Sequence, residues 1–145
     1  MATLTRYLVA DVGVVHLGFD VELVSEVLPL SGVARVPWAP RWVYGVMNHQ
    51  GRLLTLVHLA RFLELGEAAE VQDRGVAVVV DRPDLNLGLC VGSVAIVEAR
   101  DAVKVSQIKQ FLTQASWITE SLSTPALEFQ NLDLRRVIDA IEEAF

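Results

Sequence analysis

The side chains of this chain that could bind a metal or attack a substrate are three histidines and one cysteine. His16, His49 and His58 are scattered, with no two histidines at i, i+4 and no Cys-x-x-Cys pair to complete a metal site. Cys90 lies in an apolar segment, whereas a nucleophilic thiolate needs a base and an oxyanion site beside it. The pattern predicts histidines of ordinary strands and turns and a buried structural thiol.

Carboxylates and glycines give no stronger sign of catalysis. Acid–base pairs need apolar shielding or close opposition to shift their pKa values, but Asp81 and Asp84 flank a turn. Gly45 and Gly51 are isolated turn glycines and do not form a glycine-rich phosphate loop. We therefore expect a protein that is not an enzyme, with no catalytic residue, metal or cofactor.

One aromatic side chain lies where it could bind a partner protein. Trp38 lies in the loop Pro37-Trp38-Ala39-Pro40, a rigid segment with little regular structure. Such a ring is either folded back onto the protein or offered to a partner, and the residue pattern leaves both open. Arg35 and Arg41 flank this loop, and ordinary solubilising charges are the favoured interpretation for them.

Composition limits the partners of the chain. Its 145 residues, 52% hydrophobic and 21% charged, suit one domain or two small subdomains that share a core. The net charge of -6 argues against nucleic-acid binding, which depends on Lys and Arg to neutralise phosphates. No uncharged apolar run approaches the roughly 18 residues that span a bilayer, and no signal-peptide pattern opens the chain. With a lone cysteine, this predicts a cytoplasmic protein without direct membrane insertion.

The chain contains an internal repeat. The pattern Leu-Gly-x-x-Val-x-x-Val-x-x-Val starts at Leu17 and starts again at Leu87 without a gap. A second echo joins two pairs of residues that are each 17 positions apart: Trp42 and Leu59, and Trp117 and Leu134. This self-similarity predicts two related β units, approximately residues 14–70 and 71–130, with a cleft between them.

Short strands are predicted for most of the chain. Alternation, β-branched residues and Gly/Pro punctuation favour strands over residues 5–12, 14–19, 42–48, 52–57, 75–80, 85–91, 116–121 and 125–131. Residues 101–114 are expected to form a loop with a possible helical turn. Many short strands, few long helices and a duplication predict a mainly β chain of paired small barrels.

Helices are predicted at a few places. Asp20 as N-cap, apolar residues at helical spacing and the stop at Pro29 predict a short helix over residues 21–28. Residues 92–98 fit a helix or a strand, and residues 58–65 fit a short helical or an irregular segment. The stripe from Leu134 to Phe145 predicts a C-terminal helix.

A longer segment carries a resemblance to a known family. It reads Val36-Pro37-x-Ala39-Pro40-x-Trp42-Val43-x-Gly45-Val46-Met47-Asn48-x-x-Gly51-Arg52-x-x-x-x-Val57-x-Leu59. With Tyr7-Leu8-Val9 before it and Leu132-Asp133-Leu134 after it, the chain resembles the CheW-like domain of chemotaxis coupling proteins and of the CheA kinase regulatory domain.

The resemblance implies a single CheW-like domain over residues 1–145, built from two intertwined five-stranded SH3-like barrels with short helices and a C-terminal helix. It implies a non-catalytic adaptor, recruited to receptor arrays, that couples the cytoplasmic tip of a chemoreceptor to the regulatory domain of a CheA-type histidine kinase. The receptor is expected in the groove between the barrels and the kinase at the barrel ends. The partner-binding residues implied are Val36, Trp38, Arg41, Val46, Asn48, Gln50 and Gly51.

Three residues depart from the family pattern. Gln50 replaces an arginine before the turn glycine, His58 replaces an aspartate before the closing leucine, and Gly92 replaces an aspartate in the second half. Loss of the arginine removes a permanent charge and a bidentate donor. A specialised adaptor with altered kinase coupling is therefore expected. The alternative is a small-ligand or peptide-binding regulatory module, with His49 and Gln50 as polar contacts.

Overall fold

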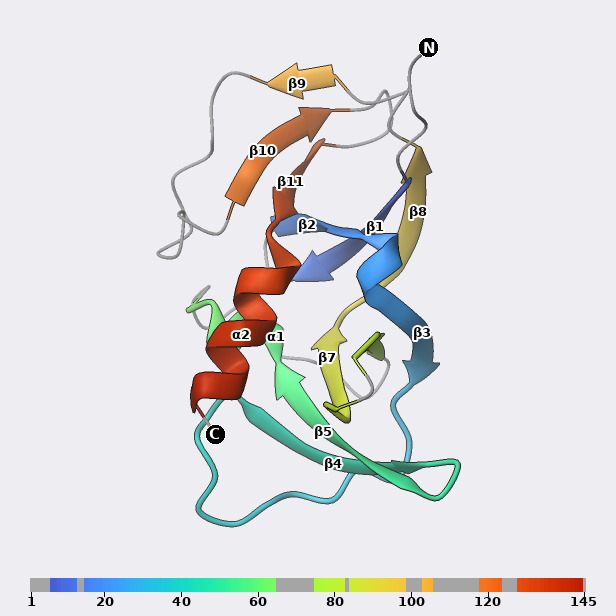
Figure 1. Cartoon of the computed structure of the whole chain (residues 1–145), viewed down its shortest axis with the longest axis vertical. Coiled ribbons are helices and arrows are strands. Elements are labelled where there is room, and N and C mark those ends of the chain that lie inside the picture. The colour runs from blue at the N-terminus through green and yellow to red at the C-terminus, as the bar shows by residue number, and fades with distance from the viewer. Residues whose placement is uncertain are drawn as a thin grey trace.

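The computed structural model of the chain describes residues 6–12, 15–64, 75–82, 84–98, 103–105, 118–123 and 128–144. Figure 1 shows two sheets placed one above the other, with a helix along one side. In chain order the elements are β1 (Arg6–Val12), β2 (Val15–Asp20), a 3-10 helix η1 (Val21–Leu23), β3 (Val24–Pro29), β4 (Val43–His49), β5 (Arg52–His58), α1 (Leu59–Phe62), β6 (Val76–Val80), β7 (Leu87–Val91), β8 (Val94–Glu98), β9 (Val103–Val105), β10 (Ile118–Ser123), β11 (Glu128–Leu132) and α2 (Leu134–Ala144).

Each sheet is assembled from both repeats. The first has the order β8-β1-β2-β11-β10-β9 and the second the order β3-β6-β7-β5-β4. The chain leaves the first sheet after β2 to become β3 of the second, and it leaves the second after β7 to become β8 of the first. Each copy of the Leu-Gly pattern is thus a strand, a corner and a strand of the other sheet. The predicted intertwined, mainly β architecture is confirmed.

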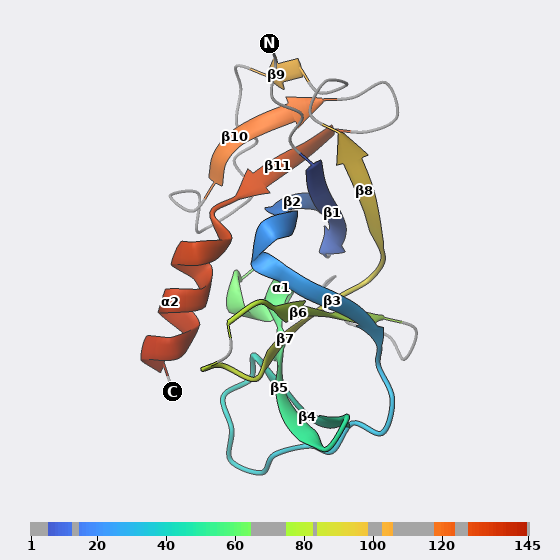
Figure 2. The ribbon, with the colours of Figure 1, turned by 45° about the vertical axis from the view of Figure 1, so that its right-hand side comes forward.

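The second sheet curls until its two edge strands meet (Figure 2). Ala34, which follows β3, exchanges two backbone hydrogen bonds with Val46 of β4, at 2.9 and 2.8 Å. Near the other end of β4, His49 Nε2 lies 3.0 Å from Glu26 Oε1 of β3. These contacts join β3 to β4, so the five strands close as in a small barrel.

Three apolar clusters hold the molecule together. The largest lies between the sheets and is formed by aliphatic side chains of β1, β2 and β7 with both helices. A second cluster inside the second barrel gathers Met47, Leu54, Leu56, Ala77, Val79 and Cys90. A third, inside the first sheet, joins Tyr7, Val9 and Phe129. Burial of each large apolar side chain contributes about 1.5–3 kcal/mol, so the cluster between the sheets is the main source of cohesion.

The helix predicted over residues 21–28 is wrong. Asp20 does cap a turn, because its Oδ1 accepts a hydrogen bond from Glu22 N at 3.0 Å, but only η1 forms. From Val24 onward the segment pairs with β6, ending at Pro29 opposite Val76. Hydrogen bonds to the edge of β6 outweigh the helical spacing of the valines, which as β-branched residues also favour strands.

The other predicted elements fare better. A strand is present at each of the eight places where the sequence predicts one. Residues 94–98, which fitted a helix or a strand, form β8. Residues 59–62 form α1, and the C-terminal stripe forms α2 with four buried apolar side chains. The loop predicted from residue 101 is wrong at β9, which pairs with β10. Trp117 and most of residues 101–114 lie outside the described residues.

Candidate functional site

The loop between β3 and β4 presents an exposed indole. Trp38 has a φ of 65°, and its side chain is 101% exposed. The proline-framed segment holds it away from the barrel, so the alternative in which the ring is folded back is wrong. The exposed guanidinium-bearing residues Arg35 and Arg41 flank the same loop.

The β4–β5 hairpin turns on two residues with positive φ. Gln50 has a φ of 53° and Gly51 a φ of 78°, as a two-residue type I′ turn requires. Asn48 Oδ1 accepts a hydrogen bond from Gly51 N at 3.1 Å, so this side chain serves the turn itself. Gln50 at the tip is exposed, and nothing in the turn depends on its amide.

The structure gathers the seven predicted partner-binding residues at one end of the second barrel, in the loop and the hairpin (Figure 1). Val36 and Trp38 are exposed, Arg41 is exposed beside the start of β4, and Val46 is half-buried and tied to the loop through Ala34. The remaining three lie at the hairpin: Asn48, Gln50 and Gly51. None of the seven lies on β3 or β8, the strands that cross between the sheets.

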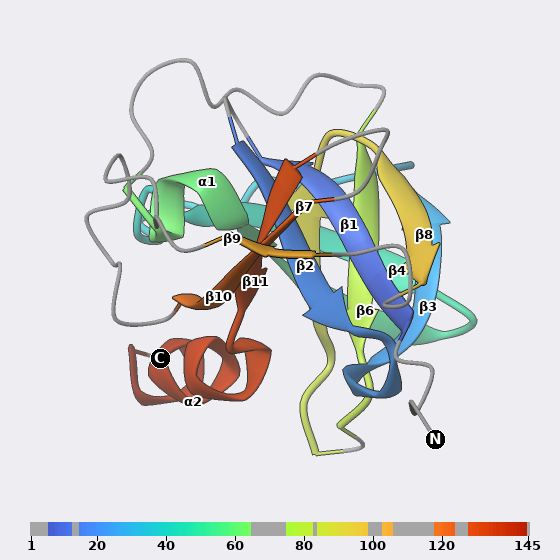
Figure 3. The same ribbon diagram turned by 90° about the horizontal axis from the view of Figure 1, so that it is seen from above.

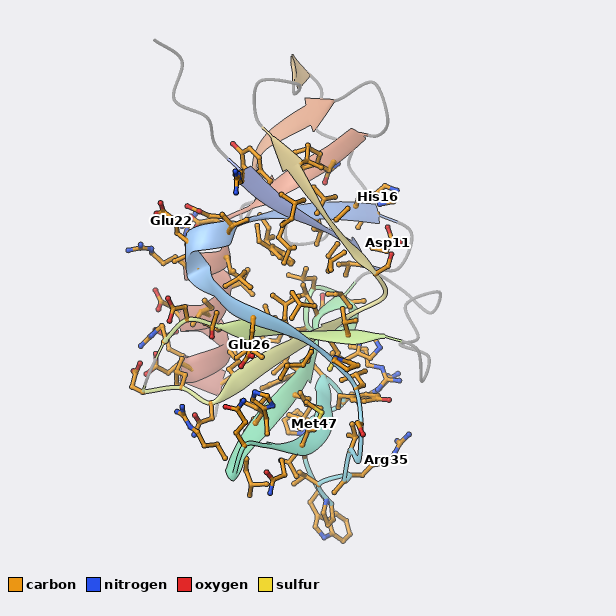
Figure 4. All side chains as sticks on the ribbon, turned by 90° about the vertical axis from the view of Figure 1, so that its right-hand side faces the viewer. Asp11, His16, Glu22, Glu26, Arg35 and Met47 are labelled. Atoms are coloured by element: carbon orange, nitrogen blue, oxygen red, sulfur yellow. The ribbon has the colours of Figure 1, made fainter. Side chains whose placement is uncertain are left out.

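The crossing strands carry exposed aliphatic side chains that sequence reasoning missed. Ile96 of β8 is 57% exposed and Val27 of β3 is 36% exposed. Figures 1 and 3 place β3 and β8 on the side of the molecule opposite α2, and Figure 4 views that side, with Glu26 on β3. The internal repeat could have indicated these residues, because Val27 and Ile96 both belong to the repeated pattern whose strands cross between the sheets.

We call this surface the seam and define it by Val27 and Ile96. On the opposite side α2 buries Leu134, Val137, Ile138 and Ile141 against the cluster between the sheets. Helix α2 therefore covers one side of the junction between the sheets, and β3 and β8 lie on the other side (Figure 3). A further exposed leucine, Leu53, is 62% exposed on β5 beside the hairpin tip.

A half-open hollow of about 350 Å³ lies beside the loop. It is lined by Leu30, Ser31, Gly32, Val33, Arg35 and Tyr44, and Arg35 lies at this end of the barrel near Met47 in Figure 4. Its floor is the apolar interior of the second barrel, since Leu30, Val33 and Tyr44 pack against that cluster. The hollow combines an apolar base with one cation.

The three histidines have structural partners. His16 Nδ1 lies 2.6 Å from Asp11 Oδ1, and His49 pairs with Glu26. His58 is buried at the start of α1, where its Nδ1 accepts a hydrogen bond from Arg61 N at 3.3 Å. Among the described residues, no three His, Cys, Asp or Glu side chains gather as metal ligands would.

Cys90 is 1% exposed inside the second barrel. Burial raises the pKa of its thiol to about 12, because the apolar surroundings disfavour the thiolate. The prediction of a buried structural thiol is confirmed. Within the described segments, no helix is long and apolar enough to cross a membrane.

Comparison with known proteins gives a consistent family. A model of the CheW-like domain matches residues 6–140. The chain is 32% identical over 78 residues to the chemotaxis protein CheW of Thermotoga maritima, covering 54% of this chain and 50% of that protein. It is 28% identical over 99 residues to the chemotaxis protein CheW of Treponema pallidum, covering 66% and 58%, and 40% identical over 57 residues to protein FrzA of Myxococcus xanthus, covering 39% and 36%.

These matches span about half the length of the curated relatives. Among solved structures, the scaffolding protein TtCheW of Thermoanaerobacter tengcongensis superposes with a TM-score of 0.71, at 15% identity, covering 90% of this chain and 89% of that one. At that identity the likeness establishes the fold alone.

Proposed function

Because the chain belongs to the CheW-like domain family, we propose that it is a non-catalytic chemosensory adaptor that couples a chemoreceptor to a CheA-type histidine kinase. It acts in the cytoplasm, recruited to receptor arrays. The observation that carries this proposal is the family match over residues 6–140, and the names of relatives, two chemotaxis proteins and one scaffolding protein, support it. The match favours an adaptor over a small-ligand module.

The seam suits the receptor. Apolar side chains of a partner pack against exposed aliphatic side chains. Val27 and Ile96 supply such contacts on the side of the molecule opposite α2 (Figure 3). Exposed apolar surface beside polar residues is typical of protein interaction sites.

The end of the second barrel suits the kinase regulatory domain. The exposed hairpin tip with Gln50 and the adjacent Leu53 offer a polar and an apolar contact on one hairpin. An arginine at position 50 would add a charge and a bidentate donor. Gln50 therefore leaves the kinase contact weaker than in members that carry arginine, by roughly ten- to a hundredfold for a lost charge-assisted hydrogen bond.

Binding to purified partners tests the proposal. The chain should bind both a receptor cytoplasmic fragment and the kinase regulatory domain of its own organism in calorimetry. Ile96→Asp should weaken receptor binding at least tenfold, because it places a charge in an apolar contact, and should leave kinase binding unchanged. Arg6→Gln, on an exposed position of β1, is the matched control. A folded chain that binds neither partner would contradict the adaptor role.

A further inference from the structure

Trp38 is held in a backbone conformation that bulky residues rarely adopt. Its φ of 65° lies in the left-handed region, which glycine and asparagine occupy with far less strain. The side chain is fully exposed, so packing inside the folded chain does not offset that strain. Outliers of this kind cluster at ligand-binding sites. The fold does not depend on packing of this indole, which makes Trp38 a candidate contact residue.

Two cations flank this indole. Arg35 and Arg41 are both exposed, and in the part of the chain that the structure describes neither guanidinium forms an ion pair. The whole chain carries a net charge of -6, so two exposed arginines within one seven-residue loop give this loop a positive charge that contrasts with the rest of an acidic protein. Such a charge attracts carboxylates and steers their approach.

Arg35 also lines the hollow of about 350 Å³. Leu30, Val33 and Tyr44 form its apolar part, and the space is enough for one large apolar side chain of a partner. A hollow lined by both a cation and apolar side chains fits a ligand that carries a carboxylate beside an apolar group.

We propose that residues 35–41, named here the Trp38 loop, dock an acidic protein segment. An apolar side chain of the segment enters the hollow, carboxylates on either side of it pair with Arg35 and Arg41, and Trp38 packs over the segment as the anchor. Exposed tryptophan and arginine are the side chains that dominate binding energy in protein interfaces. The proposal rests on the adaptor function and deepens it, because Trp38 and Arg41 belong to the implied partner-binding residues and the proposal names the chemistry of the segment that they bind; it does not depend on the seam.

A membrane surface fits this loop less well. Membrane-binding segments combine several apolar side chains with clusters of about four to eight Lys or Arg. The Trp38 loop offers two arginines within a chain of net charge -6. Repulsion between the acidic remainder of the chain and anionic lipids opposes such binding, so the charges favour a protein segment.

Photo-cross-linking identifies the occupant directly. A photoreactive phenylalanine analogue replaces Trp38 in cells of the source organism, and the captured peptide is sequenced by mass spectrometry. The expected peptide has carboxylates on both sides of an apolar residue, and the Arg35→Glu/Arg41→Glu background abolishes its capture. Capture of a neutral or basic segment, of a second copy of this chain, or of nothing would overturn the proposal.

Affinity for the captured sequence measures the anchor. A synthetic peptide of that sequence should bind the full chain in fluorescence anisotropy, with at least tenfold weaker binding to Trp38→Ala. Trp38→Gly relieves the left-handed strain, so it should melt no lower than the wild type and yet lose the same affinity. Wild-type affinity in either variant would overturn the proposal, as would Trp38-dependent binding to anionic phospholipid vesicles.

The same cells separate this proposal from the adaptor function. A photoreactive residue in place of Ile96 reports on the seam, where the adaptor function predicts capture of the receptor. Capture at position 38 without receptor or kinase binding would remove the adaptor function alone. Receptor and kinase binding without an acidic segment at position 38 would remove the Trp38 loop proposal alone.

Discussion

The two repeats take the same course through the molecule. Each runs through a hairpin (β1–β2 or β6–β7), a strand that crosses to the other sheet (β3 or β8), a second hairpin (β4–β5 or β10–β11) and a helix (α1 or α2). The second hairpin of each repeat then joins the first hairpin of the other in parallel, β11 beside β2 and β5 beside β7. Leu17 and Gly18 agree with Leu87 and Gly88, and all four are buried at these junctions, whereas Glu26 and Ile96, which differ between the repeats, are exposed.

Equivalent surface positions of the two repeats carry different side chains with different contacts. Glu26 and Ile96 occupy the same place in the repeated pattern, but Glu26 pairs with His49 and helps to close the second barrel, while Ile96 is exposed at the seam. The same backbone position therefore helps to close the barrel in one repeat and carries an exposed aliphatic side chain in the other. Substitutions at matched positions distinguish where the two repeats are equivalent from where they differ.

The repeated glycines, Gly18 and Gly88, should differ most. A Cβ at Gly18 would lie 2.7 Å from two ring carbons of Phe129, and a Cβ at Gly88 would lie 3.0 Å from Leu56 Cδ2. The Phe129 ring is buried against Tyr7, whereas Leu56 Cδ2 is the end of a flexible side chain. We expect Gly18→Ala to lower the free energy of unfolding by about 3 kcal/mol and Gly88→Ala by about 1 kcal/mol.

Urea unfolding followed by circular dichroism measures both losses. Gly18→Ala combined with Phe129→Leu is the control, because the smaller side chain makes room for the methyl group and the two losses should not add. The contacts would not control the junctions if Gly18→Ala and Gly88→Ala lowered the free energy of unfolding equally. The same would follow if the losses from Gly18→Ala and Phe129→Leu added in the double variant.

Helix caps make the second matched pair. His58 precedes α1 and Asp133 precedes α2 at equivalent positions, and each side chain accepts a hydrogen bond from a backbone N–H three residues on, at 3.3 and 3.4 Å. His58 is buried, while Asp133 is partly exposed. His58→Ala should cost about 2 kcal/mol, for the cap and the cavity together, and Asp133→Ala about 1 kcal/mol.

Thermal and urea unfolding of the two alanine variants give this comparison. His58→Asn, whose side-chain oxygen also caps, should recover part of the loss. If Asp133→Ala were the more damaging change, the replacement of the family's aspartate by His58 would have no bearing on stability.

The sequence predicts the junctions well because they depend on local patterns. The Leu-Gly repeat marks the chain positions where the sheets exchange strands, and the C-terminal stripe predicts the helix that covers one side of them. The sequence predicts β3 wrongly, because this strand pairs with residues of β6 that lie 47 to 56 positions further along the chain, and the valines of the segment also fit a helix.

The candidate site divides in the same way. The exposed hairpin tip at Gln50 follows from a local turn signal, Gln-Gly between two strands. The exposure of Trp38 does not, since the same proline-framed sequence fits a ring packed on the barrel. Seam residues such as Ile96 escape residue-by-residue reasoning because their exposure depends on which sheet each half of the repeat joins, which is a property of the fold.

Gln50→Arg tests the proposed kinase contact at the exposed hairpin tip. Position 50 already has a positive φ with a long side chain, so arginine adds no backbone strain, and the melting temperature should not change. Restored charge and bidentate geometry should strengthen binding to the kinase regulatory domain about tenfold. Gln50→Lys restores charge without the planar donor pair and should recover less. Calorimetry with no gain from either variant would place Gln50 outside the kinase contact.

The smallest expected effect concerns the attachment of the helices. Arg61 of α1 donates to the carbonyl oxygen of Arg41 at 3.3 Å. Helix α2, which is packed by its buried apolar side chains, has in addition two ion pairs, since Arg82 of the β6–β7 connection lies 3.4 Å from Asp139 and 3.3 Å from Glu142. Arg82 also pairs with Asp84 at 2.8 Å. The hydrogen bond from Arg82 lowers the pKa of Asp84 below its ordinary value of 3.8.

Arg82→Gln should lower the melting temperature slightly at low salt and not at about 1 M salt, because exposed ion pairs are weak and screened. The sign with pH follows from the lowered pKa of Asp84: its contribution is present above pH 3.8 and is lost as the pH falls through the lower folded pKa. The difference between wild type and Arg82→Gln should therefore shrink below that pH. Asp84→Asn should show the same salt dependence, and a difference that persists in high salt would mean that Arg82 acts through packing of its stem.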